Sequence, residues 1–67
     1  MSRTIEFVTA DGTTLGAATL DDDGSVDCST PAVEQTMASR RARIGDEKAF
    51  RYFETQWQNP YTRTRPA

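Results

Sequence analysis

The sequence predicts an α+β fold: an N-terminal antiparallel β-hairpin or three-stranded meander, then two short helices and an extended C-terminal tail. Three observations predict it. They are alternating β-branched residues near the start, a Thr-Pro helix start near the middle, and aromatic residues at helical spacing after it. We expect residues 1–59 to form one small domain and residues 60–67 to form an extended or disordered tail.

The first strand is expected over residues 4–9, where β-branched and aromatic residues place Ile5 and Phe7 on one face. Gly12 lies in the turn that follows, and the returning strand covers residues 14–20. Gly16 within that strand indicates a bulge or the close approach of another element. A second turn at residues 21–24 then leads to a short third strand.

The first helix is predicted to begin with Thr30 as its N-cap and Pro31 in its first turn, where a missing N–H has no consequence. It should run to about Arg43 and end at Gly45, which can adopt the left-handed conformation of a helix end. Its apolar stripe comprises Val33, Met37 and Ile44. Arg40 falls on the same stripe, so we expect its guanidinium either to extend to solvent or to pair with a carboxylate of the next helix, Glu47 or Glu54.

The second helix is expected to be capped by Asp46 and to run from Glu47 to about Trp57. Its aromatic residues stand at i, i+3 and i+7, and they are Phe50, Phe53 and Trp57. We expect this seam to pack on Ile5, Phe7 and Met37. Glu47 and Arg51 form a favourable i, i+4 pair, and Pro60 stops the helix by restricting the residue before it.

Length and composition limit the functions that the chain can have. With 67 residues and 36% apolar residues, the protein can build only one modest core. Cys28 is the only cysteine, so no disulfide forms within the chain, and a reducing compartment is expected. The first residues lack the apolar segment of a signal peptide, and no apolar run is long enough to span a membrane.

Catalytic and metal-dependent chemistry are not expected. The sequence contains no histidine, and no neighbour in the sequence would clearly activate Cys28. The carboxylates of residues 21–23 lie in a turn, and aligning Gly24 with the glycine of a calcium loop puts Thr30 where the bidentate Glu belongs. We therefore expect no enzymatic activity, no cofactor and no metal site.

Charge is distributed unevenly along the chain. Residues up to Ser39 carry a net charge of −6, whereas those from Arg40 onward carry +4. This polarity favours attraction between the two halves, head-to-tail self-association, or the steering of charged partners. The expected binding residues are arginines and tyrosines of the second half, namely Arg40, Arg41, Arg43, Tyr52, Tyr61, Arg63 and Arg65.

Two stretches, residues 15–24 and residues 49–63, resemble short uncharacterised proteins encoded by actinobacterial phages and prophages. The shared features are a Leu-Gly-x-Ala return before an Asp-Gly turn and a tail with Trp57, Asn59 and Tyr61. Pro60 replaces the small or flexible residue expected between Asn59 and Tyr61. The resemblance implies a phage protein located in the bacterial cytoplasm or in the virion, with a role in virion assembly or in manipulating the host.

Two functions follow as expectations. The first is a non-enzymatic accessory or structural protein of phage type that binds a protein partner or assembles with itself through its basic, aromatic tail. A small core favours such oligomerisation. The alternative is a nucleic-acid-associated protein that uses the basic residues from Arg40 onward.

Overall fold

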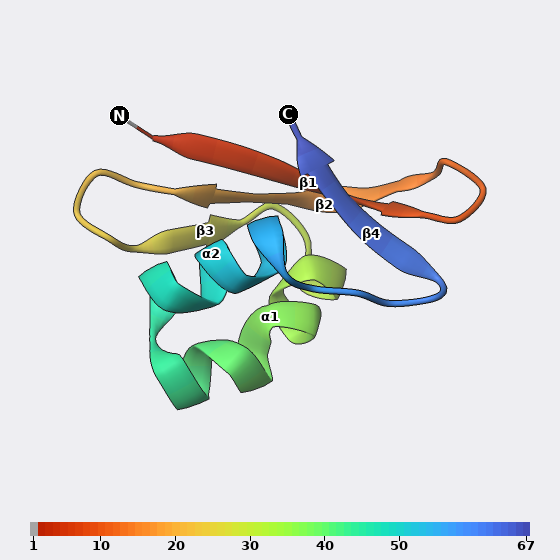
Figure 1. The fold of residues 1–67 in the computed structure, drawn as a ribbon. Coiled ribbons are helices and arrows are strands. Elements are labelled where there is room, and N and C mark those ends of the chain that lie inside the picture. The colour runs from red at the N-terminus through yellow and green to blue at the C-terminus, as the bar shows by residue number, and fades with distance from the viewer. Residues whose placement is uncertain (1) are drawn as a thin grey trace.

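The computed structural model describes residues 2–67 and has the α+β fold that the sequence predicts. Four strands form one antiparallel sheet, and both helices lie on the same side of it (Figure 1). The strands are β1 (Arg3–Thr9), β2 (Thr14–Leu20), β3 (Val26–Cys28) and β4 (Thr62–Pro66). The helices α1 (Pro31–Ile44) and α2 (Asp46–Thr55) connect β3 to β4.

The meander β1–β2–β3 is present as expected, with turns at both predicted positions. The register passes from Phe7–Gly16 to Val8–Thr14, so Leu15 is the additional residue of a bulge in β2. A Cβ added to Gly16 would lie 2.9 Å from Val33 Cγ2 and still closer to Thr30 Oγ1. The glycine therefore allows both of the features expected for it, a bulge and the close approach of α1.

Helix α1 begins as predicted. The Thr30 hydroxyl accepts a hydrogen bond from the Val33 N–H at 3.3 Å and donates one to the Leu15 carbonyl at 2.9 Å, which ties the helix start to β2. Val33 and Met37 are buried, but Ile44, predicted on the same stripe, is 40% exposed. The prediction is wrong for Ile44, which is the last residue of the helix.

The core lies between the helices and the inner face of the sheet. Its buried residues from α2, Phe50 and Phe53, pack against Ile5, Phe7 and Met37, as the aromatic spacing predicts. The helix ends at Thr55, two residues before Trp57. The Trp57 ring nevertheless packs against the core, with its centroid 5.6 Å from Phe7 and 5.2 Å from Phe53.

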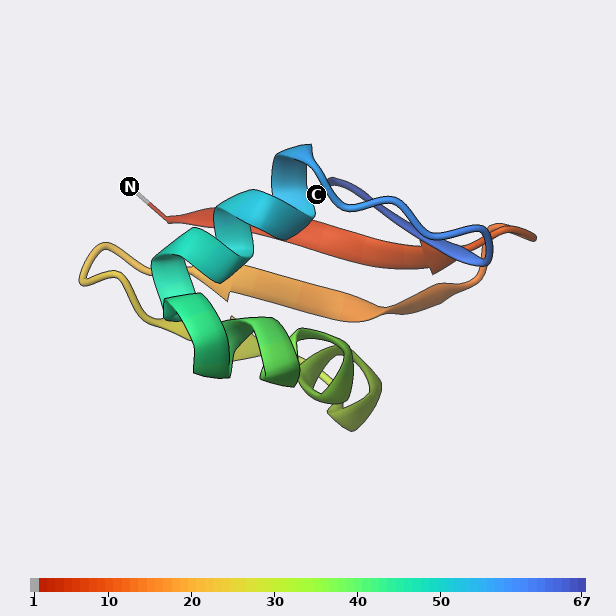
Figure 2. The ribbon, with the colours of Figure 1, turned by 60° about the horizontal axis from the view of Figure 1, so that its bottom comes forward.

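The C-terminal residues differ from expectation. Thr62–Pro66 form a fourth strand, β4, which pairs with β1 from Ile5–Pro66 to Thr9–Thr62 and places the sheet order at β3-β2-β1-β4. Residues 60–67 are thus integrated with the domain that was expected to end at residue 59. Figure 2 shows the connection from α2 turning back to bring this strand beside β1.

Candidate functional site

The seven residues expected to bind a partner do not form one surface. Arg40 and Tyr52 lie between the helices, Arg41 faces the edge of β3, and Arg43 is exposed near the end of α1. The remaining three belong to the C-terminal residues, either in β4 or in the turn before it, namely Tyr61, Arg63 and Arg65. The seven residues thus occupy four separate places on the molecule.

The turn before β4 holds an exposed tyrosine in a defined conformation. The Asn59 side-chain oxygen accepts hydrogen bonds from the N–H groups of Tyr61, at 2.8 Å, and Thr62, at 3.2 Å. The Tyr61 carbonyl accepts a third from the Ala10 N–H at 3.0 Å, which fixes the turn to the β1–β2 hairpin. The Tyr61 residue is 76% exposed.

A shallow depression of about 220 Å³ lies beside this tyrosine. Its lining comes from the hairpin, the turn and the start of β4, and consists of Ala10, Asn59, Pro60, Tyr61, Thr62 and Arg63. We call these six residues the C-terminal surface. It combines an aromatic ring and a guanidinium group, and tyrosine and arginine are both enriched at protein-binding surfaces.

Strand β4 directs its side chains alternately to the two faces of the sheet. Thr64 is on the helix side, where its hydroxyl donates a hydrogen bond to the Phe53 carbonyl at 2.7 Å. Arg63 and Arg65 are therefore on the opposite face, which the helices do not cover. Arg65 Nε lies 3.0 Å from Glu6 Oε1, whereas Arg63 forms no ion pair with any of residues 2–67.

A second depression, of about 350 Å³, lies along the two helices and is basic. Its lining residues are Arg40, Ile44, Lys48, Arg51, Tyr52, Thr55 and Gln56. The Arg40 guanidinium stacks over the Tyr52 ring at 3.9 Å from the centroid. The predicted pairing of Arg40 with Glu47 or Glu54 is wrong, because these carboxylates lie 3.1 Å from Arg51 and Arg3, respectively.

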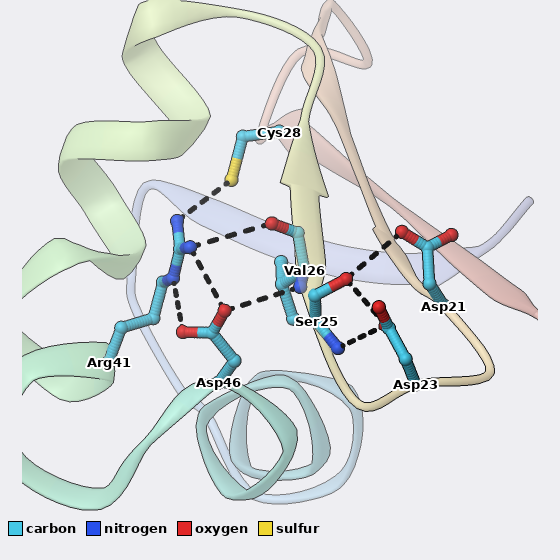
Figure 3. A network of polar contacts seen from close by, with 7 residues as sticks. All are labelled: Asp21, Asp23, Ser25, Val26, Cys28, Arg41 and Asp46. Carbon is cyan, nitrogen blue, oxygen red and sulfur yellow. Dashed lines mark hydrogen bonds and ion pairs between the residues drawn. The ribbon is translucent and has the colours of Figure 1, made fainter.

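The Arg41 side chain forms structural contacts within the fold. Its Nε lies 2.9 Å from Asp46 Oδ1, and its Nη2 donates to Asp46 Oδ2 at 3.2 Å and to the Val26 carbonyl at 3.4 Å. The Asp46 carboxylate in turn accepts a hydrogen bond from the Val26 N–H at 3.3 Å (Figure 3). Asp46 therefore does not cap α2 as predicted; Gly45 occupies the N-cap position, and the carboxylate points to β3.

The hydrogen bond from Arg41 holds the pKa of Asp46 below its ordinary value, because it stabilises the charged carboxylate. The same arginine lies beside Cys28, with Nη1 at 3.8 Å from the sulfur. Burial nevertheless raises the pKa of the Cys28 thiol and outweighs this positive charge. The thiol is protonated at neutral pH and is a weak nucleophile.

The acidic turn between β2 and β3 is organised by hydrogen bonds within the turn. Asp23 accepts bonds from the Ser25 N–H at 2.9 Å and the Ser25 hydroxyl at 2.7 Å, which lower its pKa. A hydrogen bond with the Asp27 carboxyl raises the pKa of Asp21, because it stabilises a protonated carboxyl. Within residues 2–67, no three His, Cys, Asp or Glu side chains form a group able to hold a metal ion.

Asn59 and Asp46 organise the residues at the two edge strands, Asn59 before β4 and Asp46 beside β3, and neither role was predicted; Asp46 was expected only as a helix cap. The signal for Asn59 was available, because Asn before Pro is typical of turns in which the side chain bonds the main chain two residues on. For Asp46 there was no such signal. Its position at a helix start predicts a cap equally well, and only the packing of α2 beside β3 decides the outcome.

No helix within residues 2–67 is long and apolar enough to cross a membrane. No protein-family model matches the chain, and no match to it was found among curated proteins or solved structures. The arrangement of its own residues is therefore what supports a functional assignment.

Proposed function

We propose that this protein is a non-enzymatic binding protein that recognises a protein partner through its C-terminal surface. The observation that supports the proposal most is Tyr61, which is 76% exposed and yet held in a turn by Asn59. Tyrosine and arginine are the residue types that most often dominate binding energies at protein interfaces. Tyr61 and Arg63 both line one depression.

The order of the turn adds to this argument. A flexible tail would lose conformational entropy on binding, and this loss weakens association. Here Asn59 and Ala10 hold the turn by three hydrogen bonds before any partner arrives. Tyr61 is thus presented by a preformed structure, and little of its binding energy is lost in ordering the main chain.

The test compares capture of partners by the wild-type protein and by Tyr61→Ala. The wild-type protein, immobilised and exposed to an extract of the cells that produce it, should retain a partner that Tyr61→Ala retains at least about tenfold less. Gln35→Ala is the matched control, because Gln35 is exposed on α1 and distant in sequence from the turn. Equal retention by all three proteins, with unchanged thermal melts, would contradict the proposal.

A second candidate function, nucleic-acid binding, is favoured by the basic depression along the helices. Arg40, Lys48 and Arg51 line it together with the Tyr52 ring, a combination suited to phosphates and bases. However, Arg51 pairs with Glu47, and Arg63 and Arg65 lie on the other side of the sheet. The basic residues therefore form two small groups in place of one continuous stripe.

Salt dependence separates the two functions. Nucleic-acid binding through this depression should weaken steeply with rising salt, and Lys48→Gln should reduce the slope by about one. Fluorescence anisotropy with a labelled oligonucleotide measures both effects. The phage setting implied by the sequence resemblance, a role in virion assembly, and self-assembly of the chain stay predictions.

A further inference from the structure

The outer edge of β4 presents main-chain groups that no other strand uses. The Ala10 N–H donates to the Tyr61 carbonyl at 3.0 Å, and the Ala67 N–H donates to the Thr4 carbonyl at 3.1 Å. In an antiparallel ladder, polar groups of alternate residues point to the same side. The odd-numbered residues of β4 thus bond β1, and the even-numbered residues Thr62, Thr64 and Pro66 direct their main-chain groups outward.

At two of these outward-facing residues, Thr62 and Pro66, no N–H is available to pair with another strand. The Thr62 N–H is bonded to Asn59, and Pro66 has no N–H. Among residues 2–67, no partner bonds the carbonyls of Thr62 and Pro66 or, between them, the N–H and the carbonyl of Thr64. Thr64 is therefore the one residue of this edge that can exchange two hydrogen bonds with an added strand.

The opposite edge of the sheet is obstructed at Val26. Val26 and Cys28 direct their main-chain groups outward from β3, because the Ser25 carbonyl accepts from the Asp21 N–H and the Ser29 N–H donates to the Ala17 carbonyl. The Val26 N–H is bonded to Asp46 and the Val26 carbonyl to Arg41 (Figure 3). A strand pairing with Val26 would have to displace both side chains, whereas a strand pairing with Thr64 of β4 displaces no side chain.

We propose that the edge of β4 takes up an extended, acidic segment of a partner protein as a fifth strand. This inference rests on the proposed function and names the way in which the partner binds. On the uncovered face, side chains of the added strand would lie beside Arg63 and Arg65. Carboxylates at alternate positions fit these guanidinium groups, and a carboxylate beside Arg65 would share it with Glu6.

A second copy of the chain does not fit this edge as well. If two β4 strands paired through their even-numbered residues, the odd-numbered residues would also meet, placing Arg63 opposite Arg63 or Arg65 of the second copy. Like charges directly opposite each other destabilise a strand pair. Pairing of β4 with β3 of another copy is hindered, because Asp46 and Arg41 already bond the N–H and the carbonyl of Val26.

The first test uses a synthetic peptide of seven residues, acetylated and amidated, in which glutamate alternates with valine or threonine. Calorimetric titration of the wild-type protein should detect binding of this peptide and at least about tenfold weaker binding of its lysine counterpart. Arg63→Glu should reverse the preference between the two peptides. Binding of both peptides with equal affinity, or of neither, would overturn the inference.

The second test addresses the main chain. Thr64→Pro removes the outward N–H without removing a bond to β1, and Thr64→Val is the matched control, because both variants lose the hydroxyl bond to Phe53. We expect Thr64→Pro to weaken peptide binding at least about fivefold relative to Thr64→Val. In the wild-type protein, the peptide should slow hydrogen exchange at the Thr64 amide; unchanged exchange at this amide would overturn strand addition.

The same variants separate this inference from the proposed function. Partner capture that is lost in Tyr61→Ala but equal in Thr64→Pro and Thr64→Val would overturn strand addition and leave the binding surface in place. Capture that is insensitive to all three variants would overturn both. A labelled oligonucleotide that competes with the acidic peptide and binds more tightly would also overturn the inference, since Arg63 and Arg65 would then serve nucleic acid.

Discussion

Arg41 and Asp46 form an ion pair, with Nε and Oδ1 2.9 Å apart, that binds both main-chain polar groups of Val26. Arg41 lies in the last turn of α1 and Asp46 is the first residue of α2, with Gly45 between the two helices. A side-chain pair thus joins the helix–helix corner to β3.

Asp46→Ala should lower the free energy of unfolding by about 1–2 kcal/mol, because it leaves Arg41 unpaired and the Val26 N–H without its acceptor. Glu47→Ala is the matched control, since it removes a carboxylate from the same first turn but breaks only an exposed pair with Arg51. Urea denaturation followed by circular dichroism measures both. Equal destabilisation by the two variants would show that the β3 contact contributes nothing.

Acid should weaken this contact. The pKa of Asp46 is lower in the folded state than in the unfolded chain, so its contribution is complete above the unfolded value, near pH 4. It is lost as the pH falls through the folded value. Asp46→Asn should therefore show a shallower fall in melting temperature from pH 5 to pH 2 than the wild type. Asp11 and Asp23, whose pKa values are also lowered, contribute equally to both proteins.

Gly16→Ala should destabilise the fold by about 2–4 kcal/mol. The new methyl group would clash with Thr30 and Val33, and the main chain at φ +148° is unfavourable for any other residue. Gly12→Ala separates the two causes, because Gly12 also has positive φ but nothing lies within 4 Å of the added atom. That variant should lose only about 1 kcal/mol. Thermal melts that rank the two variants in reverse order would contradict the close approach of α1.

Phe50→Ala should unfold the protein under ordinary conditions. Truncating a fully buried phenylalanine typically costs about 3–5 kcal/mol, which is comparable to the whole stability of so small a domain. Ile44→Ala, at the exposed end of α1, should cost less than about 1 kcal/mol. A cooperative melt of Phe50→Ala at the wild-type temperature would show that α2 does not pack as described.

Removing residues 61–67 should also unfold the protein or lower its melting temperature strongly. The truncation deletes β4, exposes the buried Val8 and leaves the edge of β1 open. A tail outside the domain, as the sequence suggested, would leave the far-ultraviolet circular dichroism spectrum and the melt intact. Deleting Ala67 alone, which gives up one bond to Thr4, is the control and should change little.

The sequence predicted those helices and strands whose characteristic residues lie close together in the chain. The spacing of Phe50, Phe53 and Trp57 and the Thr30–Pro31 start predicted helices that the structure contains. Strand β4 contributes no buried residue to the core, and its sequence of Thr, Arg and Pro resembles that of a solvated tail. It is a strand because β1 offers an unpaired edge, which is a property of the folded sheet.

The candidate site was predicted only in part. Residues such as Tyr61 and Arg63 were identified by type, but the sequence could not separate them from Arg41, which has the same side chain as Arg40 and Arg43. On a helix, neighbouring residues point in directions about 100° apart, so one arginine of this group stacks on Tyr52 and the next binds β3. Which of them stays available is decided by the packing of α2.

The pairing of β4 with β1 also has a consequence for how the chain folds. Ile5 pairs with Pro66, so the sheet unites residues from opposite ends of the described sequence. Contacts between distant residues form late, because the intervening chain loses much entropy when its ends meet. On a ribosome, the meander and both helices will have emerged before residue 66 is available. Pairing of β4 with β1 must therefore follow synthesis of β4. Until then the main-chain groups on that edge of β1 are unpaired, and chaperones have to protect them from other strands.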